Sequence, residues 1–143
     1  MVSNSTEQNV AVRRAIPMID VDSTLEEGVV TVNFRGPVTN REFIDLATTI
    51  ADSGSTGSVL MYLDWVGIDR WAFSVPTANG VTEWRRARKM IARAAIVHQP
   101  RLNRPAAWLA AFLREEGVKV RSWRPHNAAA AATWLRVTNA ALP

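Results

Sequence analysis

The 143-residue chain contains no cysteine, so disulfides, thiol nucleophiles and cysteine metal sites are excluded. It also lacks an apolar run close to the ~20 residues that a transmembrane helix needs. Its first residues, MVSNSTEQNVAVRR, do not place a basic start before an apolar stretch, as a signal peptide does. These absences predict a cytoplasmic protein without a transmembrane segment.

Sequence motifs of common active sites are missing as well. Neither G-x-G-x-x-G nor G-x-x-x-x-G-K-[S/T] occurs, so a nucleotide-binding loop is not indicated. The two histidines, His98 and His126, lie far apart and form no His-x-x-x-His pair. Asp64 and Asp69 could act as a general acid and base, but no nucleophile–base pair accompanies them. The sequence therefore favours a protein that is no enzyme and holds no cofactor or metal.

Charge is present but unevenly distributed. Residues 1–82 carry 5 arginines against 10 acids, whereas residues 83–124 carry 11 lysines and arginines against 3 glutamates. The basic side chains of such a segment either lie in water on the outer faces of helices or face an anionic partner. The first interpretation is the more common one for a basic run. The run EWRRARKMIAR within it suggests phosphate contacts beside Trp84, but a basic run alone predicts only weak, nonspecific nucleic-acid binding.

The first part of the chain predicts a tail and two strands. Residues 1–15 are polar and aperiodic, which is typical of a flexible N-terminal tail. Residues 16–22 alternate loosely, and residues 28–36 alternate cleanly between apolar and polar side chains, as half-buried strands do. The short link between them indicates antiparallel neighbours.

Strands and helices then alternate along the chain. Thr39 and Glu42 form a T-x-x-E capping box ahead of an apolar stripe, which predicts a helix ending near Gly54. The unbroken apolar run in GSVLMYLDW is typical of a central parallel strand covered on both faces. Further helices are expected over residues 75–89, in RPAAWLAAFLREEG and in NAAAAATWLRVTNAAL, with strands at IARAAIVH and VKVRSW.

This order, β-β-α-β-α-β-α-β-α, predicts a single α/β domain over residues 16–143. The sheet should be mixed and mostly parallel, with five strands and four helices. The segments that follow one another in this order are the opening strand pair, TNREFIDL, VLMYLDWVGID, RAAIVH, PAAWLAAFL and AAATWL. In these segments the chain resembles the SpoIIAA-like family, which has the STAS fold and is also compared with the Sec14/CRAL-TRIO fold.

The resemblance also implies a position for a phosphorylation site. In STAS proteins a strand ending in aspartate leads to a phosphorylatable serine at the next helix, and Asp64 and Ser74 match these positions. The chain departs from the family pattern there, because AFSVP replaces the expected Asp-Ser-Ser-Gly. The resemblance therefore does not imply a phosphorylation switch at Ser74.

Asp64 is expected to begin a loop at the carboxyl end of a strand, where open α/β sheets place their ligands. Trp65 and Trp71 flank this loop and are candidates for a pocket lining or an exposed docking patch. The predicted site for a ligand or partner comprises Asp64, Trp65, Asp69, Arg70, Trp71, Phe73, Ser74, Arg85 and Arg86.

Two functions are compatible with this site. The first is a non-catalytic, STAS-like regulatory domain that binds a protein partner, either another protein or a second copy in a homodimer. In that case the aromatic residues form the anchor, and Asp69 and Arg70 form a polar rim. The alternative is a small carrier or sensor of a lipid or hydrophobic anion of the Sec14-like type. Trp65, Trp71 and Phe73 would then line a pocket, with Arg85 on the head group.

Overall fold

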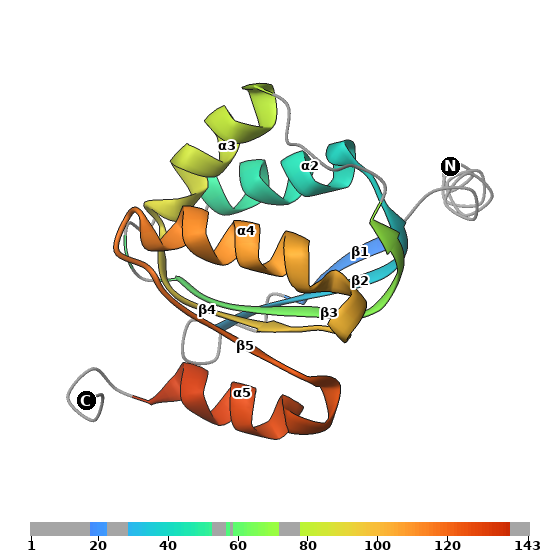
Figure 1. Cartoon of the computed structure of the whole chain (residues 1–143). Coiled ribbons are helices and arrows are strands. Elements are labelled where there is room, and N and C mark those ends of the chain that lie inside the picture. The colour runs from blue at the N-terminus through green and yellow to red at the C-terminus, as the bar shows by residue number, and fades with distance from the viewer. Residues whose placement is uncertain (1–17, 23–28, 53–56, 58, 72–77, 138–143) are drawn as a thin grey trace, which may run out of the picture.

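The computed structural model describes residues 18–22, 29–52, 57, 59–71 and 78–137. Figure 1 labels the helices and strands within these ranges. The strands are β1 (Met18–Asp22), β2 (Val29–Val38), β3 (Val59–Trp71), β4 (Ile91–Val97) and β5 (Lys119–Trp123). The helices are α2 (Asn40–Ala51), α3 (Ala78–Arg88), α4 (Asn103–Arg114) and α5 (Ala128–Arg136), with short 3-10 turns η2 (Pro100–Leu102) and η3 (Pro125–Asn127).

The five strands form one sheet in the order β1-β2-β3-β4-β5. Strands β2 to β5 are parallel, and β1 pairs antiparallel with β2 at one edge. The predicted α/β fold with a mixed, mostly parallel sheet and four helices is confirmed. Consecutive strands lie side by side because each crossover helix returns the chain to the next position in the sheet.

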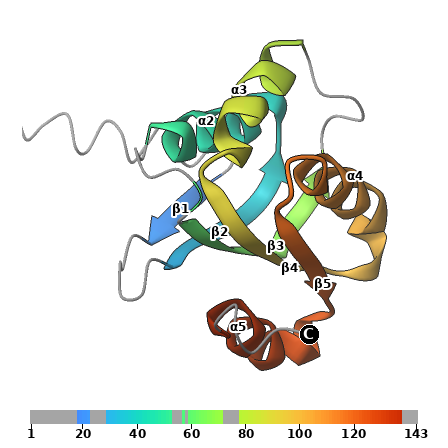
Figure 2. The same ribbon diagram turned by 90° about the vertical axis from the view of Figure 1, so that its left-hand side faces the viewer.

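The helices are divided unequally between the two faces of the sheet. Helices α2, α3 and α4 cover one face, and α5 alone lies on the other (Figures 1 and 2). Val32, Leu63 and Ile96 belong to the larger core beneath the three helices. Ala95 and Leu135 belong to the smaller core beneath α5. The continuous apolar runs in β3 and β4 follow from this covering of both faces.

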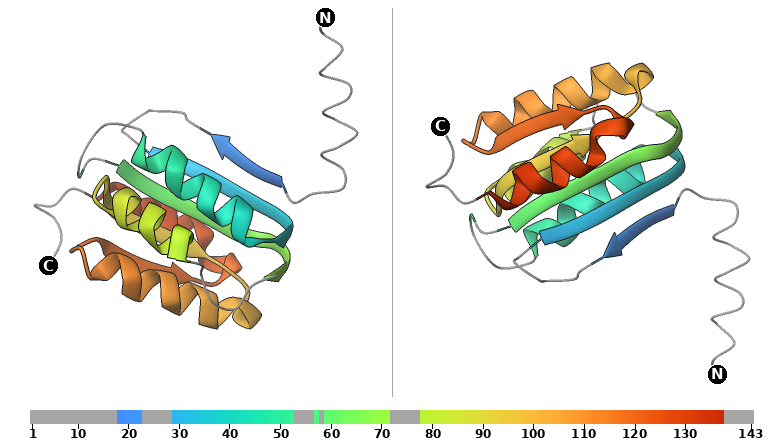
Figure 3. Two further views of the ribbon diagram at one scale, coloured as in Figure 1. Left: turned by 90° about the horizontal axis from the view of Figure 1, so that it is seen from above. Right: turned by 90° about the horizontal axis from the view of Figure 1, so that it is seen from below.

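Helix α2 forms as its sequence predicts. The backbone N–H of Thr39 donates to the Glu42 carboxylate at 3.0 Å, as part of a reciprocal capping box. Its buried side includes Phe43, Leu46 and Ile50, which have the spacing of one helical face. Viewed from above, α2 runs beside α3 over the sheet (Figure 3). The helical face therefore packs against both the sheet and α3.

Strand β3 differs from the prediction. Its apolar run ends at Leu63, and a loop was expected from Asp64, but the strand continues to Trp71. Residues 67–71 stay extended because they pair with residues 35–38 of β2. The apolar run therefore corresponds only to the part of β3 that pairs with β4 on one side and with β2 on the other.

Candidate functional site

The candidate site begins at an irregularity in β3. Asn33 pairs with Asp64 and Arg35 with Gly67, so two residues of β3 lie opposite one of β2, which is the pattern of a β-bulge. The Asp64 carboxylate accepts a hydrogen bond from the Val66 N–H at 3.0 Å and supports this bend. A Cβ at Gly67 would lie 2.9 Å from the Phe34 carbonyl oxygen, so glycine permits the close approach of the two backbones.

Beyond the bulge, β2 and β3 continue as a two-stranded ribbon. Strand β4 ends at Val97, opposite Asp64, so the later part of β3 has no strand partner on that side. The Arg101 guanidinium lies there instead and donates to the carbonyls of Ile68 and Asp69, the latter at 2.7 Å. Arg101 thus occupies part of the open edge and fixes the ribbon. Nothing in the local sequence of β3 indicates this residue, because it comes from η2.

Of the two alternatives predicted for Trp65, a pocket lining or an exposed docking patch, the exposed patch is wrong. Its side chain is fully buried, and its ring lies 5.9 Å from Phe34 and 4.8 Å from Trp71. Every second side chain of β3 points toward α2, α3 and α4, and these side chains include Met61, Leu63 and Trp65. The prediction of a loop from Asp64 onward did not extend this alternation to Trp65. Trp71 is only half-exposed and packs against Phe43 at 5.5 Å, so it joins the core rather than standing free.

Asp69 and Arg70 remain as the exposed residues at the end of the ribbon. They lie at the carboxyl end of β3, and their assignment to a polar rim stays a prediction. Phe73 and Ser74, which the sequence also assigned to the site, lie outside the described residues.

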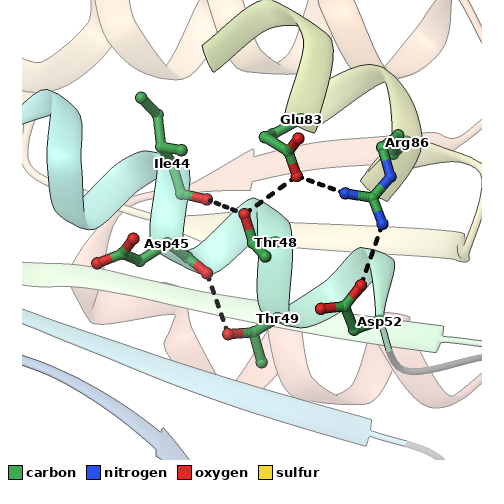
Figure 4. Close-up of polar contacts among 7 residues, drawn as sticks. All are labelled: Ile44, Asp45, Thr48, Thr49, Asp52, Glu83 and Arg86. Carbon is green, nitrogen blue, oxygen red and sulfur yellow. Dashed lines mark hydrogen bonds and ion pairs between the residues drawn. The ribbon is translucent and has the colours of Figure 1, made fainter. Parts of the chain in front are cut away.

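Arg86 is held by a polar network between α2 and α3 (Figure 4). Its guanidinium lies 2.6 Å from the Glu83 carboxylate and 3.0 Å from that of Asp52. Thr48 donates a further hydrogen bond to Glu83 at 3.1 Å. The charge of Arg86 is therefore compensated by two acids.

Arg85 lies on the exposed side of α3, at an open depression of ≈ 370 Å³. The depression is lined by Ala51, Thr82, Arg85, Arg86, Lys89 and Met90. It lies beside the amino-terminal end of β3, because the carbonyls of Lys89 and Met90 accept bonds from residues 57 and 59. Asp69 and Arg70 lie at the opposite, carboxyl-terminal end of the same strand. The structure does not bring the two halves of the predicted site together.

Two other residues of the basic run have structural roles. Trp84 is fully buried, and its indole N–H donates to the Phe43 carbonyl at 3.1 Å, so it offers no exposed stacking surface. Arg93 is only 4% exposed and donates to the carbonyls of Trp134, Leu135 and Val137 at the end of α5. Sequence reasoning grouped Arg93 with the solvated cations and missed this role, because its partners lie more than 40 positions later.

The groups considered for acid–base or metal chemistry do not converge. The His98 ring is buried, with Nδ1 2.7 Å from the Gln99 carbonyl oxygen. In the part of the chain that the structure describes, no three His, Cys, Asp or Glu side chains gather as metal ligands would. Burial raises the pKa of the Tyr62 phenol, and the nearby charge of Asp64 raises that pKa further.

The strand order and the placement of the helices define the fold. A comparison with protein-family models identifies the family that has it. The sequence model of the SpoIIAA-like family matches residues 29–136. The chain belongs to the SpoIIAA-like family. This match spans the sheet from β2 onward and all four described helices.

Solved structures with a SpoIIAA-like fold are similar to this family member. One is an uncharacterized protein of the DUF3478 family from Shewanella loihica PV-4, with 14% identity and a TM-score of 0.58. The alignment covers 83% of this chain and 93% of that one. A second is the anti-sigma factor antagonist SpoIIAA in its unphosphorylated form, with 10% identity and a TM-score of 0.47, covering 81% of this chain and 98% of that one. No curated protein matched the chain.

Proposed function

We propose that this SpoIIAA-like protein is a non-catalytic regulatory domain that binds another protein through the ribbon formed by residues 35–38 and 67–71. The observation that carries the proposal is the exposed pair Asp69 and Arg70 on a fixed backbone. One side of β3 is paired with β2, Arg101 occupies its other edge, and Trp71 packs on Phe43. A preorganised polar surface of this kind loses little entropy when a partner binds.

The charges of Asp69 and Arg70 suit selection of a partner. Their charges are opposite, so the two residues favour a partner surface with complementary charges and disfavour one with the reverse arrangement. Neither side chain forms an ion pair with another described residue, so both remain available.

The carrier alternative has less support. A carrier of a hydrophobic anion needs an enclosed apolar cavity. The space beneath α2 and α3 near Trp71 is occupied by the rings of Phe43, Trp65 and Trp84, in centroid contacts of 4.7 to 5.5 Å. The depression beside Arg85 is open and lined by three cationic side chains.

A charge swap tests the proposal. The variant Asp69→Lys with Arg70→Glu keeps the net charge but reverses the polarity of the pair. We expect it to lower the affinity for a partner purified with the wild-type protein, or the self-association constant if the partner is a second copy, by about tenfold or more. Isothermal titration and native mass spectrometry measure these two quantities.

The control is a second exposed pair, Arg41 and Asp45 on α2, whose side chains are 85% and 69% exposed. The swap Arg41→Glu with Asp45→Lys should leave both quantities unchanged. If the two swaps weaken binding equally, or if neither does, the ribbon is not the contact surface.

A further inference from the structure

A second surface is formed by β5, η3 and α5, and it is unusual in charge. Residues 117–137 contain no aspartate or glutamate. Lys119, Arg121 and Arg124 are all exposed there. We call these three cations together with Trp123 and Trp134 the β5–α5 patch.

The acids that precede this patch do not neutralise it. Glu83 pairs with Arg86, while Glu115 and Glu116 both lie within 3.6 Å of the Arg88 guanidinium. The ion pairs among the described residues leave Lys119, Arg121 and Arg124 without an acidic partner. The positive charge of the patch is therefore available to something outside the chain.

The patch also contains two half-buried tryptophans. Trp123 on β5 and Trp134 on α5 lie 5.2 Å apart at the edge of the smaller core. Arg121 lies over the Trp123 ring at 5.0 Å, and Arg93 lies 5.8 Å from the Trp134 ring. With each indole in contact with the other and with a guanidinium, neither is arranged as a free stacking platform for bases.

The position of α5 favours a broad anionic surface. Of the described helices, only α5 lies on that face of the sheet, so it forms the outer layer of the described residues there (Figures 2 and 3). Its exposed residues include Ala129, Ala130 and Thr133, which are small and uncharged. Indoles that are apolar at one side and polar at the other partition into the head-group region of bilayers, where nearby cations contact anionic lipids.

We propose that the β5–α5 patch binds the surface of a bilayer that contains anionic phospholipids. The binding is peripheral: among the described residues, no helix is long and apolar enough to cross a membrane. This proposal does not rest on the protein partner proposed above, because it uses different residues and a different assay.

Vesicle binding of the full chain tests the proposal. We expect association with mixed phosphatidylcholine–phosphatidylglycerol vesicles that weakens as salt is added, and little association with phosphatidylcholine alone. Each cation near an anionic surface contributes about a fivefold factor. The variant Lys119→Gln/Arg121→Gln/Arg124→Gln should therefore lower the partition coefficient about a hundredfold.

The control variant Arg41→Gln/Lys89→Gln/Arg104→Gln removes three exposed cations elsewhere and has the same net charge. It should retain most of the binding. Brominated lipids should quench tryptophan fluorescence in the wild-type protein and in the control variant. Circular dichroism confirms that both variants are folded.

Four outcomes overturn the proposal. They are absence of binding to anionic vesicles at low salt, equal losses in the two variants, and binding without tryptophan quenching. The fourth is that an RNA oligonucleotide binds through the same three cations and anionic vesicles do not bind.

Discussion

At the scale of single residues, two buried tryptophans differ in one hydrogen bond. Trp65 and Trp84 are both fully buried in the same core. The Trp84 indole N–H donates to the Phe43 carbonyl, whereas the Trp65 indole N–H has no partner among the described residues. A buried donor without a partner costs free energy, while a satisfied one contributes to stability.

The variants Trp84→Phe and Trp65→Phe remove the same atoms from the same kind of environment. We expect both to destabilise the fold through lost packing, and Trp84→Phe to lower the free energy of unfolding by about 1 kcal/mol more, because it alone loses a hydrogen bond. Urea unfolding measures the difference. An equal loss, or a larger one for Trp65→Phe, would contradict this assignment.

Tyr62 permits a direct measurement of a raised pKa, because it is the only tyrosine in the chain. We expect the phenolate absorbance of the native protein to titrate above the ordinary pKa of 10.0, and that of the denatured protein near it. Since the folded state retains the phenol proton to higher pH, the free energy of unfolding falls as the pH rises through the folded pKa.

The variant Asp64→Asn separates the two causes of this shift. It should lower the native titration midpoint of Tyr62 without abolishing the shift, because burial is the larger cause. A native midpoint at or below the denatured one would show that the phenol is not desolvated.

At the scale of the elements, a single arginine joins α5 to the sheet. Arg93 lies on β4, and its Nη1 donates to the Trp134 and Leu135 carbonyls in the last turn of α5, where the helix itself does not continue to supply donors. The same guanidinium contacts the Trp134 ring. One buried side chain thus caps the helix and fixes it against the smaller core.

Arg93→Met keeps the apolar stem but removes these donors. We expect a loss of about 1.5–3 kcal/mol in the free energy of unfolding, the range for hydrogen bonds to a charged group. Hydrogen exchange should become faster in α5 while α4 stays protected. The control is Arg104→Met, an exposed position on α4, which should change stability by no more than about 0.5 kcal/mol. Unchanged protection of α5 would refute the capping role.

At the scale of the whole molecule, residues of the acidic and basic parts of the sequence meet on one side of the sheet. Asp52 of α2 binds Arg86 of α3, and Arg88 joins α3 to the end of α4 through Glu115 and the Phe112 carbonyl. In these contacts, the few acidic residues near the basic helices join neighbouring helices to one another. Among the other cations, Arg93 and Arg101 donate to backbone carbonyls, whereas Lys119, Arg121 and Arg124 are exposed and have no acidic partner among the described residues.

The whole chain should show no hydrolase or phosphatase turnover on a broad substrate panel. The reason is geometric: the Asp64 carboxylate binds the Val66 N–H, and the Asp69 side chain has no described partner that could serve as a nucleophile or base. Steady-state assays check this expectation. Turnover abolished by Asp64→Ala or Asp69→Ala would show that the protein is an enzyme.

The sequence by itself determined the elements and their order. The Thr39–Glu42 capping box, the stripe along α2 and the alternation in β2 are local patterns, and each predicts its element without knowledge of the rest of the chain. From the order of these elements the parallel sheet and the family resemblance followed.

Tertiary structure decided which polar and aromatic residues are available. Trp65 looked like a loop residue, but pairing with β2 extended β3 and turned the indole into the core. The sequence indicated that Arg93 is a surface cation, but in the fold the end of α5 lies over it. Arg85 and Asp69 are only 16 positions apart, yet they lie toward opposite ends of β3. Contacts between distant segments fix exposure and convergence, and no local pattern encodes such contacts.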